Sequence, residues 1–96
     1  MERTTSIQIG QVVRSKTGRD KDRVFLVSEI LDLHYVMLID GDLRRLANPK
    51  KKKIKHLVVY QTVLKEFQER LDSDIKINNA YLRRLLAPYN EHKENR

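Results

Sequence analysis

The sequence predicts a mainly β fold, a small barrel followed by two C-terminal amphipathic helices, in a chain of 96 residues. Short β-branched and apolar runs recur at close spacing with glycine-containing turns between them, which favours a small barrel over an open sheet. After Val59 the apolar period changes from two to about 3.6, which is typical of helices. This length suits a single domain, since domains cluster at about 100–150 residues. We therefore expect a barrel over residues 1–59, a two-helix extension over 60–90 and a frayed polar tail over 91–96.

Four strands are expected in the barrel, at residues 10–16, 23–31, 34–40 and 54–59. The first stops at Thr17-Gly18 and the third at Gly41-Asp42, where glycine permits the positive φ of a tight turn. The second contains four consecutive apolar residues, which suits a strand covered on both faces. The fourth follows Pro49, and the residue before a proline favours extended geometry.

Two helices are expected after the barrel, each with one apolar face. The first face has helical spacing at Tyr60, Val63, Leu64, Phe67 and Leu71, and Asp72-Ser73-Asp74 ends that helix. Asn78 or Asn79 is a suitable N-cap for the second helix. Its apolar face consists of Tyr81, Leu82, Leu85, Leu86 and Tyr89, and Pro88 and Asn90 are expected to end it.

The chain is strongly basic, with 20 Lys and Arg against 13 Asp and Glu, a formal charge of +7 and a pI near 9.9. This balance indicates a polyanionic partner, most often nucleic acid. Residues 44–55 concentrate the excess, since they carry seven of the basic residues and no acid. Apolar residues flank this segment at Leu43, Leu46, Ile54 and Leu57, so we expect an ordered basic edge and not a loose tail.

Several functional classes find no support in the sequence. The chain has no Cys, so it offers no disulfide framework or thiolate site, and we expect an intracellular, cytoplasmic protein. No secretory signal is recognisable, and no apolar run approaches the ~20 residues of a membrane span. The three His show no metal-ligand spacing, and the three Gly form no phosphate-binding fingerprint. We expect no enzyme, cofactor, metal or small-molecule substrate.

The segments GQVVRSKTGRDKDRVFLVSEIL (10–31) and GDLRRLANPKKKKIKHL (41–57) carry a family resemblance. The first resembles the KOW motif of SH3-like barrels in ribosomal and transcription proteins, with Gly18 as its turn glycine. Together the segments are similar to bacterial KOW-domain RNA-binding proteins, which are related to the fourteen-e family of archaeal and eukaryotic large-subunit ribosomal proteins. The resemblance covers about residues 9–58 and implies an SH3-like barrel that binds structured RNA through its basic loops.

The resemblance and the charge pattern together predict a set of RNA-binding residues. These are Arg14, Lys16, Gly18, Arg19, Lys21, Arg23, Arg44, Arg45, Lys50, Lys51, Lys52, Lys53, Lys55 and His56. Relatives tend to have a second glycine where this chain has Asp22. Asp tolerates the left-handed region better than most residues, so the turn can form, but its carboxylate weakens the local phosphate site.

The expected function is RNA binding in the translation apparatus, without catalysis, with ribosomal RNA as the partner. His34, Tyr35 and His56 are candidates for stacking on an unpaired base, although a strand tyrosine belongs more often to the core. The alternative is a protein-interaction adaptor that docks a protein partner through the SH3-like barrel and the apolar helical face. A contact with a ribosomal protein through helices 61–71 and 79–89 is a further candidate interaction. DNA binding ranks last, because both helices are close to neutral and neither resembles a recognition helix.

Overall fold

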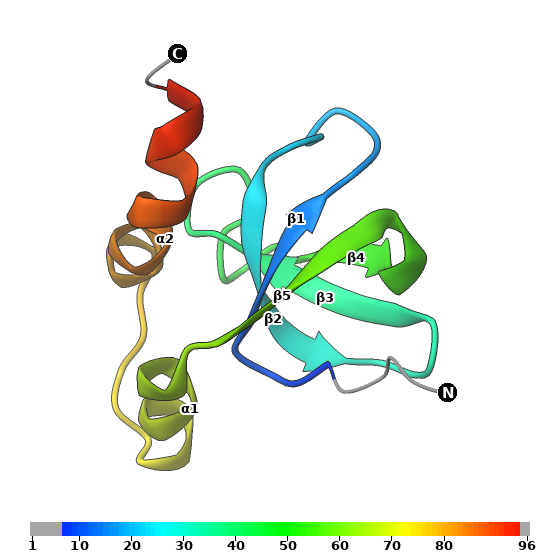
Figure 1. Ribbon diagram of the computed structural model, residues 1–96. Coiled ribbons are helices and arrows are strands. Elements are labelled where there is room, and N and C mark those ends of the chain that lie inside the picture. The colour runs from blue at the N-terminus through cyan, green and yellow to red at the C-terminus, as the bar shows by residue number, and fades with distance from the viewer. Residues whose placement is uncertain (1–6, 95–96) are drawn as a thin grey trace.

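The computed structural model describes residues 7–94, which form one five-stranded antiparallel sheet and two helices (Figure 1). The strands lie in the order β4-β3-β2-β1-β5. The elements in chain order are β1 (Gln11–Ser15), β2 (Val24–Ile30), β3 (Tyr35–Ile39), β4 (Lys50–Lys53), the 3₁₀ turn η1 (Ile54–His56), β5 (Leu57–Val63), α1 (Lys65–Asp72) and α2 (Asn79–Glu94).

The sheet is curled like a barrel, because its two outer strands are neighbours in the chain. β4 and β5 lie at opposite ends of the strand order, yet only the three residues of η1 join them. A 3₁₀ turn of that length spans about 6 Å, so the two edges must come together there. The backbone N–H of Lys16, at the end of β1, also donates to the carbonyl of His56 at 2.9 Å. The expected mainly β, barrel-like fold is confirmed at this level.

Both faces of the sheet are apolar, which explains the unbroken apolar run in β2. Alternate residues enter two different cores. The inner core lies within the curl and contains Val13, Phe25, Val27, Val36, Leu38 and Leu57. The outer core lies between the sheet and the helices and contains Val12, Val24, Leu26, Ile39, Phe67, Tyr81, Leu82 and Leu86. The helical segment is therefore an integral layer of the structure.

Both helices lie along one flank of the sheet, on the left in Figure 1. Asn78 caps α2, since its side-chain oxygen accepts the backbone N–H of Tyr81 at 2.8 Å. This capping residue was one of the two that the sequence offered. Near the other end of α2, the Asn90 side chain accepts the backbone N–H of Val24 at 3.1 Å. This second contact fixes α2 against the start of β2.

Three expectations about element bounds are wrong. The lysine run was not expected to form a strand, but residues 50–53 pair with β3. The chain stays extended past Tyr60 to Val63, because β1 continues to pair with it as far as Gln11. Consequently the predicted 59/60 boundary falls inside β5, and the first helix begins only at Lys65. The second helix continues through Pro88 to Glu94, so the expected polar tail over 91–96 is helical in its first part, and residues 95–96 lie outside the described chain.

Candidate nucleic-acid interface

The strand β4 consists of four lysines and forms an edge of the sheet, on the far side from the helices in Figure 1. Lysine is a poor strand former, but charged residues suit an edge strand because they oppose pairing with another chain. Successive side chains of a strand point to opposite faces. Lys50 and Lys52 therefore share the inner face, and Lys51 and Lys53 share the outer one. The run separates into two pairs with different surroundings.

The inner pair binds Asp20, a carboxylate of the β1–β2 loop that is only 8% exposed. The Lys52 ammonium lies 3.2 Å from Asp20 Oδ1 and that of Lys50 lies 3.5 Å from Oδ2. The Ser15 hydroxyl donates to Oδ1 at 2.8 Å. Burial by itself raises the pKa of Asp20, but the Ser15 hydrogen bond and the two ammonium groups outweigh it, so the pKa lies below its ordinary value. This ionised cluster joins the β1–β2 loop to β4.

The outer pair lies beside an aromatic ring. The Lys51 ammonium is 4.7 Å from the centroid of the Tyr35 ring and that of Lys53 is 5.9 Å from it, both within cation–π range. Tyr35 is half-buried and is not part of either core. The expectation that this strand tyrosine belongs to the core is therefore wrong. The outer core ends at Ile39 on this strand, and Met37 and Tyr35 continue the same face beyond it.

Further cations gather where β4 meets η1. Partial desolvation lowers the pKa of His56, and the positive charges of Lys55, Lys52, Lys53 and Lys16 lower it further. Lys16 and Lys55 are exposed. The positive charges of these lysines therefore favour the neutral form of His56.

The β1–β2 turn has the geometry that the sequence predicted. Gly18 has φ +84° and Asp22 has φ +72°, so Asp22 adopts the left-handed conformation in place of a second glycine. The Asp22 carboxylate pairs with the Arg14 guanidinium at 3.0 Å. The turn thus presents Arg19 and Lys21 to solvent, while the acid at Asp22 compensates the charge of Arg14.

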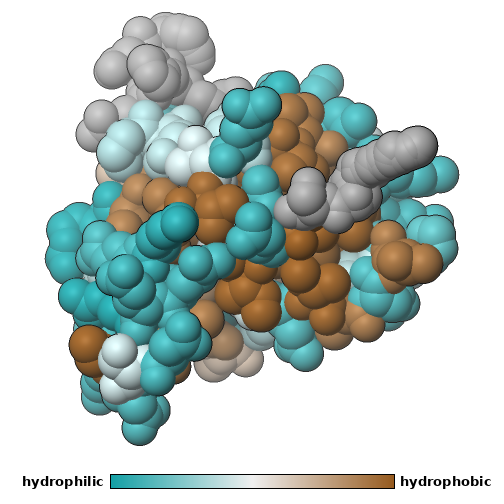
Figure 2. All heavy atoms as spheres, turned by 60° about the horizontal axis from the view of Figure 1, so that its bottom comes forward, coloured by the Kyte–Doolittle hydropathy of each residue, from teal (hydrophilic) through white to brown (hydrophobic). Residues whose placement is uncertain are grey.

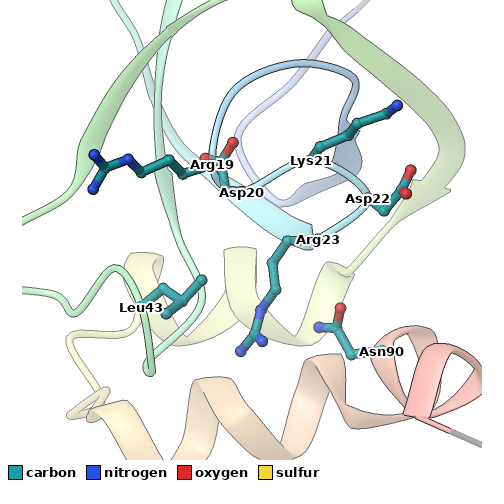
Figure 3. A pocket seen from close by; sticks show the side chains of 7 residues that line it. All are labelled: Arg19, Asp20, Lys21, Asp22, Arg23, Leu43 and Asn90. Carbon is teal, nitrogen blue, oxygen red and sulfur yellow. The ribbon is translucent and has the colours of Figure 1, made fainter.

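Arg23 is held by two carboxylates. Its guanidinium lies 3.2 Å from the buried carboxylate of Asp40 and 2.7 Å from that of Asp42. Figure 3 shows this side chain pointing away from Lys21, toward Leu43 and Asn90. Arg23 thereby joins the start of β2 to the loop after β3 and lies apart from the cations of β4.

The β3–β4 loop carries two more arginines, of which Arg44 lies beside the start of β4. Asp40 Oδ1 accepts the backbone N–H groups of Asp42 and Arg44 at 2.9 and 2.8 Å, which shapes the start of the loop. Arg44 is half-buried and Arg45 is exposed. A pocket of about 310 Å³ is lined by Arg19, Asp20, Phe25, Leu43, Arg44 and Lys50. Cations from three chain segments therefore meet around Asp20.

Most of the predicted site residues thus surround one edge of the sheet. Lys16, Arg19, Arg44, Lys50, Lys52, Lys53, Lys55 and His56 are linked through Asp20, His56 or the shared pocket. Lys51 joins them through the Tyr35 ring, which it shares with Lys53. Arg14 and Arg23 have carboxylate partners. Sequence reasoning missed the role of Asp20, which in the sequence is only one of two acids among the bases of the first turn.

The helical face proposed for protein docking is largely covered. Phe67, Leu82 and Leu86 are each at most 2% exposed in the outer core, and Leu64 and Leu85 pack against it. The adaptor hypothesis therefore loses the apolar face on which it depended. Figure 2 shows a separate apolar area on the side that forms the bottom of Figure 1. Large apolar residues exposed in the described chain include Ile9, Ile30, Leu31, Leu33 and Val59.

Among residues 7–94, no group of three or more His, Asp or Glu side chains could hold a metal ion. In the same part of the chain, no helix is long and apolar enough to cross a membrane.

Fold and surface together define a small, basic, barrel-like domain whose edge strand is made of lysines. No protein-family model matches the chain. The chain is 33% identical over 73 residues to a Bacillus subtilis (strain 168) protein named "Putative ribosome-binding protein YbzG", an alignment that covers 76% of this chain and 99% of the relative. The chain therefore belongs to the same family as this Bacillus protein.

Proposed function

We propose that this protein binds structured ribosomal RNA through the basic edge formed by β4, η1 and the β1–β2 loop, and that it acts in the translation apparatus without catalysing a reaction. The observation that carries the proposal is the ordered strand of four lysines with further cations beside it. Its relative is named as a ribosome-binding protein. Because ribosomes work in the cytoplasm, we expect this protein to act there.

The strand arrangement supports the SH3-like, KOW-type interpretation. Five antiparallel strands in the order β4-β3-β2-β1-β5, whose outer two meet at a 3₁₀ turn, support a small barrel of this kind. Gly18, the turn glycine of the resemblance, has the positive φ that the motif needs. The relation to the fourteen-e ribosomal proteins belongs to the same proposal.

Some of the basic residues are placed to bind RNA, and others stabilise the loops. The exposed cations Lys16, Arg19, Lys21, Arg45, Lys51 and Lys55, with the half-buried Lys53, are placed to neutralise phosphates. Lys50 and Lys52 hold the β1–β2 loop through Asp20, and Arg23 holds the β3–β4 loop. Folded RNA offers backbone and 2′-OH groups to such a surface, so shape supplies the specificity.

The salt dependence of RNA binding tests the proposal. Each phosphate contact contributes about 0.7–0.9 to the slope of log K against log salt. Replacing Lys51, Lys53 and Lys55 with Ala should weaken binding to a ribosomal RNA fragment and flatten that slope by about two units. The control replaces Lys65, Lys76 and Arg84 with Ala, which removes the same charge from exposed positions on the two helices and the loop between them. Equal losses in both variants would show that binding depends only on net charge and would overturn the proposed interface.

A further inference from the structure

Tyr35 is an aromatic side chain held at a fixed place beside the basic edge. The Asp32 carboxylate accepts the backbone N–H groups of His34 and Tyr35 at 2.8 and 2.9 Å. The Tyr35 carbonyl accepts the N–H of Leu31 at 3.0 Å. These bonds fix the turn between β2 and β3, so the ring needs little further ordering when it binds a ligand.

The cations beside Tyr35 are available to an anion. Lys53 is the register partner of Tyr35, and Lys51 lies on the same face one pair further along. Among the side chains of residues 7–90, no ion pair joins a carboxylate to Lys51 or Lys53. Asp32 Oδ1 already accepts two backbone N–H groups, which lower the pKa of this carboxyl, and the charge of Lys51 lowers it further. The face therefore combines an aromatic ring with two positive charges.

A groove of about 670 Å³ opens next to the ring, within the size range of small-ligand sites, about 300–1,000 Å³. It is lined by Leu33, His34, Tyr35, Lys53, Ile54 and Lys55. The N–H of Ile54 donates to the carbonyl of His34 at 2.8 Å, which joins its two walls. Leu33 is 89% exposed at the rim. Apolar and aromatic walls with cations at one side suit a flat ring that carries a phosphate.

We propose that this groove binds one unpaired nucleobase of RNA, stacked on Tyr35, with the flanking phosphates on Lys51, Lys53 and Lys55. The inference rests on the proposed RNA-binding function and adds a preference to it. A nucleobase inside a continuous duplex cannot reach the ring, whereas an extruded or single-stranded base can. The protein therefore distinguishes a bulged or looped RNA from a duplex of equal charge.

The test compares two RNAs of the same length, a perfect duplex and a duplex with one bulged 2-aminopurine. Wild-type protein should bind the bulged RNA more tightly and quench its fluorescence on stacking. Tyr35→Ala should weaken binding to the bulged RNA at least about fivefold, since one stacked base contributes about 1–3 kcal/mol. Binding to the duplex should stay unchanged, and Tyr35→Phe should retain the preference.

A second variant avoids any effect on folding. Leu33→Ala alters a side chain that is almost fully exposed, so it should lower affinity for the bulged RNA severalfold at unchanged stability. Equal affinity of the wild type for both RNAs, or equal losses for both in Tyr35→Ala, would overturn the stacking site and leave the RNA-binding function standing. Absence of salt-dependent binding to either RNA would overturn the proposed function together with the site.

Discussion

Replacement of Lys52 with Met tests whether the inner lysines are structural. The change removes an ammonium that is 3.2 Å from Asp20 Oδ1 and 3.0 Å from the Thr17 carbonyl. Breaking a buried ion pair by removing one partner costs about 3–5 kcal/mol. Ser15 and Lys50 still stabilise the Asp20 carboxylate, so we expect the lower end, about 3 kcal/mol. That is a large share of the roughly 5–15 kcal/mol available to a domain.

Urea unfolding followed by circular dichroism measures this loss. With an m-value of about 1–3 kcal/mol per M, the midpoint should fall by at least about 1 M. Lys51→Met is the matched control, because it removes the same charge from the outer face of the same strand. Its cost should stay below about 1 kcal/mol, the value of an exposed cation–π contact. Equal costs for the two variants would refute the assignment of opposite roles to neighbouring lysines.

The pH dependence provides an independent check on Asp20. A carboxyl whose folded pKa is lowered contributes stability that is present above its unfolded pKa of about 3.9 and lost as pH falls through the folded value. The stability gap between wild type and Lys52→Met should therefore be full near pH 7 and shrink below about pH 4. A gap of constant size down to the acid transition would show that the pair does not depend on ionised Asp20.

Three further predictions concern the helical layer and the turns. Phe67→Ala should cost about 3–5 kcal/mol and lower the Tm of a single cooperative transition, because Phe67 is buried in the outer core; separate transitions for sheet and helices would contradict this. Gly18→Ala should lower the free energy of unfolding by about 1–2 kcal/mol, because position 18 has a positive φ. Gly41→Ala should lower the Tm further than Gly18→Ala does, because its Cβ would also collide with a backbone carbonyl of α2. Equal shifts in Tm for the two variants would argue against that close approach. Asp22→Gly should raise RNA affinity up to about fivefold in a filter-binding assay, since it removes a carboxylate and releases Arg14; unchanged affinity would show that this turn lies outside the interface.

The strand pattern of the sheet was readable from the sequence because it depends on local alternation and glycine turns. The β4 strand was not, since Lys50–Lys53 has no strand propensity of its own and is extended only because β3 pairs with it. The segment from Tyr60 to Leu64 was predicted wrongly as the start of a helix. Its apolar spacing fits a helix, yet pairing with β1 keeps it extended as far as Val63. In both cases tertiary pairing determined the local structure.

The candidate site shows the same limit. The sequence showed which segment was basic, and its apolar flanks predicted that the segment would be ordered. The structure confirms this for residues 50–53. Nothing in the sequence indicated that two of the four lysines would turn inward, because that depends on the burial of Asp20, which precedes Lys50 and Lys52 by 30 and 32 residues. The exposure of Tyr35 was equally hidden, since it follows from where the helices stop covering the sheet.

Sedimentation with ribosomes tests the central claim most directly. Tagged wild-type protein in a cell lysate, layered on a sucrose gradient, should travel with the ribosomal large subunit. The variant with Lys51, Lys53 and Lys55 replaced by Ala should remain at the top of the gradient. The control with Lys65, Lys76 and Arg84 replaced by Ala, which lie on the helices and the loop between them, should sediment as the wild type does. A wild-type protein that stays at the top, or a β4 variant that still sediments fully with ribosomes, would contradict the account.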